Sequence, residues 1–198
     1  MCPALPSQFS IPDLSGLDDH LVANLVLSMS IGRGFPPGNA QHLVTAFVRT
    51  TESALRRYEA ARAQLEGSAA AQSLAAYLRG LDDMELTYIA LNRAMRLAVA
   101  LKQSPDTNVS RTDLPSKQDQ DRLRLMRDAI EHRESPIMAN LAGIGKTVAL
   151  SVRESDSTIE DATRSYTATH DTLASWIQRL HALAVKLTNE PQVWSRRT

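Results

Sequence analysis

Three residues near the end of one predicted helix, Arg127, Asp128 and His132, are of types that can carry out chemistry together. A neutral imidazole can take the proton from a ribose 2′-hydroxyl group or give a proton to the leaving 5′-oxygen. A guanidinium can stabilise the negative charge that builds up on the phosphate in the transition state. An ionised carboxylate accepts hydrogen bonds and can orient either partner. These residue types suit RNA cleavage without a metal ion.

The spacing of Arg127 and His132 leaves a second interpretation open. The two residues are five positions apart, which places them about 140° apart around a regular helix. They can share a site only if the helix ends or relaxes at His132, or if the Arg127 side chain reaches around the helix. Ser135 before Pro136 favours a helix end there. Basic residues at a helix C-terminus also complement the helix dipole, and Arg127 with Glu131 forms an ordinary i,i+4 pair. From spacing alone, this electrostatic interpretation is favoured.

Two other candidate sites are rejected on their patterns. Residues 140–147 resemble the end of a phosphate-binding loop, but Asn140 stands where the first glycine is required and a strand is expected to follow. The acidic and histidine residues lack the Glu-x-x-His pattern of metal sites in helical bundles. We therefore expect neither a metal site nor a cofactor, and interpret nearly all of these side chains as solvated: Asp18, Asp19, Asp82, Asp83, Glu85, His20, His42, His170 and His181.

Composition narrows the class of protein. The 198 residues include 22 basic and 22 acidic ones, and a zero net charge argues against a protein that coats nucleic acid, although it allows a small basic groove. Cys2 is the only cysteine, no Lys or Arg precedes Arg33, and no apolar stretch reaches the roughly 18 residues of a membrane span. We expect a cytoplasmic protein without a membrane partner.

The abundance of Ala and Leu predicts an all-α fold, an up-and-down bundle of four to five helices. In the first helix, a stripe of Leu17, Leu21, Leu25 and Met29, widened by Val22 and Val26, is expected to face the core. Gly67 and Ser68 are expected to end the second helix, and Gly80 either splits or kinks the third region. The predicted helical ranges are 15–30, 39–66, 69–103, 116–132 and 167–188.

A small β-hairpin is expected before the last helix. Val148, Leu150 and Val152 alternate as in a strand, the turn falls at 154–157, and Thr158 and Ile159 begin the return strand. In domain terms, we expect an extended N-terminal arm over 1–14, a single helical domain over 15–190 and a mobile tail over 191–198.

The segment Leu-Met-Arg127-Asp128-Ala-Ile-Glu-His132 resembles the Arg-x4-His signature of HEPN domains. In that family the residue after the arginine is often Asn, Asp or His, and Asp128 matches this. The resemblance implies a helical bundle, catalytic roles for Arg127 and His132, and a supporting role for Asp128. It also implies a metal-independent endoribonuclease of the kind found in toxin–antitoxin pairs and phage defence. RNA, a second copy of the chain and an antitoxin protein are then the expected partners.

Two hypotheses of different classes follow from these observations. The first is a HEPN-like endoribonuclease that cleaves RNA by attack of the 2′-hydroxyl group. The alternative is a non-catalytic helical module of HEPN-like fold that dimerises or binds a partner protein, with the same residues acting as helix-end electrostatics. If Arg127 and His132 are catalytic, both should border a groove. In either case Leu123, Met126 and Ile130 should face the core.

Overall fold

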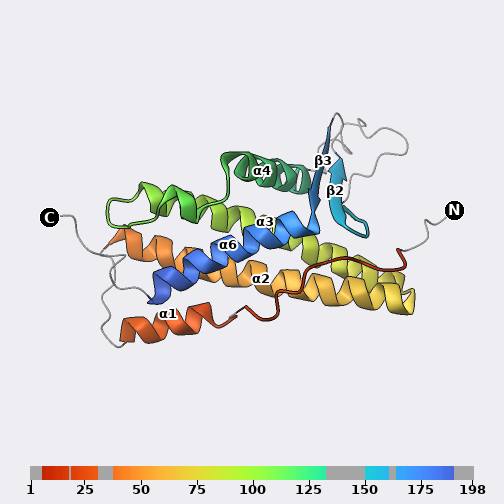
Figure 1. Ribbon diagram of the computed structural model, residues 1–198, viewed down its shortest axis with the longest axis horizontal. Helices are drawn as coiled ribbons and strands as arrows, with labels where there is room; N and C mark the ends of the chain where they lie inside the picture. The colour runs from red at the N-terminus through yellow and green to blue at the C-terminus, as the bar shows by residue number, and fades with distance from the viewer. Residues whose placement is uncertain (1–5, 18, 31–37, 133–149, 161–163, 190–198) are drawn as a thin grey trace.

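The structure is a computed structural model that describes residues 6–17, 19–30, 38–132, 150–160 and 164–189 (Figure 1). Most of these residues are helical, and a small antiparallel sheet precedes the last helix, as the sequence predicts. The elements along the chain are α1 (Leu21–Ser30), α2 (Asn39–Ala71), α3 (Leu74–Gln103), the 3₁₀ turn η1 (Arg111–Asp113), α4 (Lys117–Glu131), β1 (Ser151–Val152), β2 (Asp156–Glu160), β3 (Ser165–Thr169) and α6 (His170–Asn189).

The long helices α2 and α3 form a hairpin around which the other elements pack (Figure 1). Gly67 and Ser68, the predicted end of the second helix, lie inside α2, so that prediction is wrong. The Ser68 hydroxyl donates to the Leu65 carbonyl at 2.6 Å, which satisfies it within the helix. The helix ends instead at Gln72, which adopts a left-handed conformation with φ 48°. Ser73 then caps α3 by accepting the Ala76 N–H at 3.3 Å.

Gly80 does not split α3, which is continuous from Leu74 to Gln103. A Cβ atom at position 80 would lie 2.7 Å from Cγ of Leu65 on α2. The glycine therefore allows the two helix backbones to approach closely. This packing requirement explains a glycine in a helix interior, where it otherwise costs stability.

The predicted hairpin forms, but it is part of a three-stranded antiparallel sheet. β1 pairs with β2 so that Ser151 lies opposite Thr158, and β2 pairs with β3 so that Ile159 lies opposite Tyr166. The start of the last helix at Thr167 is therefore a wrong prediction, because Ser165–Thr169 is the third strand. Ser165, Thr167 and Thr169 are of residue types that fit both a strand and the start of a helix. Their pairing with β2 determines that this segment is a strand.

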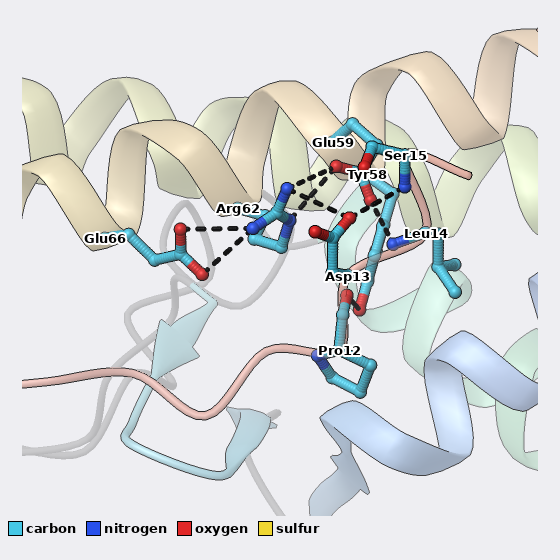
Figure 2. Close-up of polar contacts among 8 residues, drawn as sticks. All are labelled: Pro12, Asp13, Leu14, Ser15, Tyr58, Glu59, Arg62 and Glu66. Carbon is cyan, nitrogen blue, oxygen red and sulfur yellow. Dashed lines mark hydrogen bonds and ion pairs between the residues drawn. The ribbon is translucent and has the colours of Figure 1, made fainter. Parts of the chain in front are cut away.

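The N-terminal segment 6–17 lies along the helices as a strap (Figures 1 and 2). The Tyr58 hydroxyl of α2 donates to the Pro12 carbonyl at 2.9 Å, and Oε1 of Glu59 accepts the Leu14 N–H at 2.8 Å. Leu14 is 3% exposed, so the strap contributes to the core. Burial is the largest influence on the pKa of Tyr58 and raises it above the usual range. The hydroxyl therefore stays protonated and remains a hydrogen-bond donor.

The first helix begins at Leu21 rather than near residue 15, which corrects the predicted boundary. The Ser15 N–H donates to Oδ1 of Asp13 at 2.8 Å, and this local turn replaces a helical start (Figure 2). The helix starts where Oε2 of Glu52 accepts the Val22 N–H at 2.7 Å. Because the first N–H groups of a helix lack internal partners, a carboxylate from α2 stabilises this start.

The core is formed by the apolar faces that the helical periodicity predicts for α2 and α6. On α6, Leu173, Ile177 and Leu180 have no exposed surface, and Leu187 is 2% exposed. The stripe predicted for α1 is wrong in part, because Leu21 and Leu25 are buried whereas Val26 and Met29 are not. In the described ranges, no helix combines the length and the hydrophobicity needed to cross a membrane.

Candidate functional site

The helix α4 carries all three predicted site residues, and its ends lie where the sequence places them. Ser116 is the N-cap: its hydroxyl oxygen accepts the Asp119 N–H at 3.1 Å and donates to the Asp119 carboxylate at 2.6 Å. At the other end His132 is the C-cap, with φ −104° and ψ 12°. The His132 N–H donates to the Asp128 carbonyl at 3.0 Å. The helix therefore ends at His132, as Ser135-Pro136 predicts.

One face of α4 fixes this helix on the rest of the molecule. Leu123 and Met126 have no exposed surface, and Ile130 is 4% exposed, which confirms the predicted core face. These side chains pack α4 against α3, and the helix also contacts β2 and β3 (Figure 1). Arg127 and Asp128 lie beside this contact and are partly buried, with side chains 24% and 35% exposed.

Arg127 is held by two carboxylates of its own helix. Its Nη1 atom lies 2.9 Å from Oδ1 of Asp128, and its Nη2 atom forms an ion pair with Oε2 of Glu131. These interactions, led by the hydrogen bond to Asp128, raise the pKa of Arg127. Asp128 also pairs with Arg124, at 3.4 Å. The i,i+4 pair of Arg127 with Glu131 that the electrostatic interpretation predicts is thus present, and Arg124 with Asp128 forms a second one.

His132 is exposed at the end of α4, and Arg127 is not joined to it. Among the described residues, no hydrogen bond or ion pair involves the His132 side chain. The Nε atom of Arg127 is buried and has no partner in the same part of the chain. The structure therefore pairs Arg127 with Asp128, and among the described residues no side-chain bond joins either of them to His132.

The remaining sequence candidates have structural surroundings or lie outside the described residues. Asp83 pairs with Arg57 at 3.4 Å and accepts a hydrogen bond from Nε2 of Gln64 at 3.1 Å. The Asp83 carboxylate therefore links α3 to α2. His170 and His181 are buried, at 0% and 6% exposure, so the expectation of solvated histidines is wrong for these two. Residues 133–149, with the phosphate-loop-like segment, and residues 190–198, with the predicted tail, are outside the described ranges. Within those ranges, no group of three His, Cys, Asp or Glu residues could hold a metal ion.

A second charged region was missed from the sequence. Lys102, Arg111, Lys117 and Arg179 line one hollow, although they come from α3, η1, α4 and α6. No fixed spacing joins residues so far apart along the chain. The neutral residues of the lining do not indicate a binding site in the sequence either, because their types are common in connections between helices. They are Gln103, Pro115, Ser116 and Gln120. Only the tertiary fold brings these cations together.

Comparison with known proteins adds no relative to this picture. The chain matches no protein-family model, no curated protein and no solved structure. The likeness to HEPN domains thus remains a prediction that depends on the residues of α4 alone.

Proposed function

We propose that this chain is a non-catalytic helical module that forms a homodimer through the outer face of α1. The observation that carries this proposal is the exposure of three large apolar side chains on a helix of ten residues. Val26, Leu27 and Met29 are 55%, 61% and 40% exposed. Large exposed apolar side chains close together on one helix are typical of protein–protein contacts, where a second copy would remove them from water.

α1 is well placed to present such a face. Leu21 and Leu25 hold its inner side in the core, and the Ser28 hydroxyl donates to the Thr188 carbonyl of α6 at 3.0 Å. The helix is therefore fixed against α2 and α6. A rigid apolar face loses little conformational entropy on association, which favours binding.

The charges of α4 support the non-catalytic role. A guanidinium that stabilises a phosphate in the transition state needs donors directed toward the substrate. Arg127 instead directs Nη1 to Asp128 and Nη2 to Glu131, so substrate would have to displace two carboxylates of the same helix. The interpretation as helix-end electrostatics requires no such rearrangement.

A HEPN-like, metal-independent endoribonuclease is the second candidate. It is favoured by the exposed His132 and by Nε of Arg127, which has no hydrogen-bond partner among the described residues. In this mechanism His132 removes the proton from the 2′-hydroxyl group, whose oxygen attacks phosphorus while the 5′-oxygen leaves with a proton. Arg127 stabilises the charged phosphate and Asp128 orients the guanidinium. The products carry a 2′,3′-cyclic phosphate and a 5′-hydroxyl group. A toxin role with an antitoxin partner would follow from the family resemblance.

Sedimentation of the wild-type protein over a concentration series tests the dimer. We expect a dimer that Leu27→Glu converts to a monomer, because the substitution places a charge in the contact. Leu78→Glu is the matched control, since Leu78 is 51% exposed but belongs to α3. A wild-type monomer at every concentration, or equal loss of dimer in both variants, would contradict the proposal.

Incubation with total RNA in EDTA decides between the two candidates. Wild type, Arg127→Ala and His132→Ala are compared, and the ends of any products are identified. Intact RNA in all three reactions supports the non-catalytic module. Cleavage by wild type alone, with 2′,3′-cyclic phosphate ends, would assign the ribonuclease activity to these residues.

A further inference from the structure

A hollow of about 680 Å³ is lined by residues of the connection between α3 and α4 and by Arg179 of α6. Lys102 at the end of α3, Arg111 of η1, Lys117 at the start of α4 and Arg179 of α6 contribute four positive charges to its lining, and we call it the basic hollow. Among the residues that the structure describes, no carboxylate lines it. In a chain with zero net charge, such a concentration of one sign is a local feature of the fold.

The acidic residues near the basic hollow are engaged elsewhere. Asp113 accepts the Ser110 N–H at 2.7 Å and pairs with Lys186 at 3.4 Å. Asp119 binds the Ser116 hydroxyl at the cap of α4. Neither of these two carboxylates lines the basic hollow.

Three of the four lining cations make no ion pair within the described part of the chain. Lys117 pairs with Asp121 at 3.1 Å. Lys102, Arg111 and Arg179 make none, and all three are exposed. Their charge is therefore available to an anionic ligand.

Hydrogen bonds within the protein fix two side chains that line the basic hollow, Arg179 and Gln120. Nη1 of Arg179 donates to the Leu114 carbonyl at 3.1 Å, which fixes the guanidinium. This bond uses one of the five N–H donors of the guanidinium. Nε2 of Gln120 donates to the Pro115 carbonyl at 2.9 Å. Leu114 itself is 4% exposed and anchors this connection in the core. A fixed guanidinium suits phosphate oxygens, which it can bind through two parallel hydrogen bonds.

The size and lining of the basic hollow indicate the class of ligand. Its volume is within the usual range for small-molecule sites and exceeds the space that one phosphate group needs. Val99, Leu114 and Pro115 add apolar surface, and Gln103 and Thr112 add neutral hydrogen-bonding groups. We propose that the basic hollow binds a small organic molecule that carries at least two phosphoryl groups. This site is separate from the dimer face of α1 and does not depend on it.

A second basic groove provides the control. Arg49, Arg57 and Arg93 line a space of about 420 Å³ between α2 and α3. Here Arg57 is paired with Asp83 at 3.4 Å, and the three cations come from two neighbouring helices. Removing Arg49 and Arg93 lowers the net charge by the same amount as removing Lys102 and Arg111. The two double variants therefore separate local binding from general attraction.

Calorimetric titration of the full-length protein with pyrophosphate and with orthophosphate tests the site, at low ionic strength and near physiological ionic strength. We expect pyrophosphate to bind more tightly, because it presents more charge to the same four cations. Lys102→Gln with Arg111→Gln should weaken pyrophosphate binding by roughly tenfold or more. Arg49→Gln with Arg93→Gln should leave it within about twofold. The unfolding temperature of each variant without pyrophosphate shows whether the fold is retained.

Three outcomes would overturn the proposal. One is the absence of pyrophosphate binding by the wild-type protein at low ionic strength. Another is equal weakening by the two double variants, which would indicate attraction by overall charge. The third is binding of a single-stranded RNA oligonucleotide at the basic hollow that pyrophosphate cannot displace, which would assign the surface to a polymer. None of these results depends on dimerisation or on RNA cleavage, so the earlier proposal is judged separately.

Discussion

The two ends of α4 use charged residues in opposite ways. At the C-terminal end, Arg127 is compensated within the helix by Asp128 and Glu131. At the N-terminal end, cations from four elements meet around a hollow that none of the described carboxylates lines. Charges that are close in sequence on a helix tend to pair with each other, which neutralises them. The fold also pairs some charges that are far apart in sequence, such as Lys186 with Asp113. Around the hollow, however, Lys102, Arg111 and Arg179 have no ion pair among the described residues and remain available to a ligand.

The largest effect is expected from Leu123→Ala, because Leu123 has no exposed surface and holds the middle of α4 against the core. The substitution should lower the free energy of unfolding by roughly 2–5 kcal/mol, from lost burial and the cavity left behind. Urea denaturation measures this change. Loosening α4 should weaken both of its ends, so pyrophosphate affinity should fall as well. Leu125→Ala, at a partly exposed position of the same helix, is the control and should cost clearly less.

Intermediate effects should distinguish the cap from the ion pairs. Ser116→Ala removes the acceptor for the Asp119 N–H and should cost about 1 kcal/mol. Arg127→Gln removes pairs within one helix turn and should cost about 0.5 kcal/mol or less, since such pairs contribute little in water. Thermal unfolding of the two variants under one condition measures both. If Arg127→Gln is the more damaging change, Arg127 is a structural cation, and the comparison between the two ends must be revised.

Much of α4 could be predicted from local signals. Its core face follows from helical periodicity, its start from Ser116 and its end from the residues before Pro136. The pairing of Arg127 with Glu131 follows from i,i+4 spacing. Each of these depends on residues within a few positions, where helix geometry alone fixes which side chains meet.

The features that escaped prediction depend on residues far apart along the chain. α1 begins late because Glu52 of α2 accepts the Val22 N–H, and Gly80 is needed because of Leu65. β3 is a strand because β2 pairs with it. The basic hollow likewise needs residues from four elements, and no single segment carries its signal. The same argument explains why the predicted α1 stripe is too wide. The helix packs on α2 and α6 through its inner side, and the outer residues Val26 and Met29 stay exposed.

The smallest effect at neutral pH, and a distinct one in acid, is expected at His170. Nδ1 of His170 lies 3.0 Å from the Ser10 carbonyl oxygen, and because a carbonyl only accepts, Nδ1 must donate. Nε2 is buried and has no partner in the described part of the chain, so the ring is accommodated as neutral. Burial lowers the pKa of His170, although the Ser10 carbonyl and the nearby carboxylates Asp156 and Asp171 oppose it.

The sign of the pH dependence follows from this lowered pKa. As the pH falls below about 6.5, the ordinary pKa of histidine, the His170 ring is protonated in the unfolded chain but still neutral in the folded chain. Stability should therefore decrease on acidification until the pKa of the folded state is reached. His170→Asn keeps a side-chain donor for Ser10 without the titration, and its unfolding free energy should change less between pH 7 and pH 5.5. His132→Asn, at the exposed end of α4, should retain the wild-type slope. If His170→Asn also retains the wild-type dependence of stability on pH, the acid sensitivity arises at another group. The bond between His170 and the Ser10 carbonyl of the strap then does not depend on the protonation of His170 in this pH range.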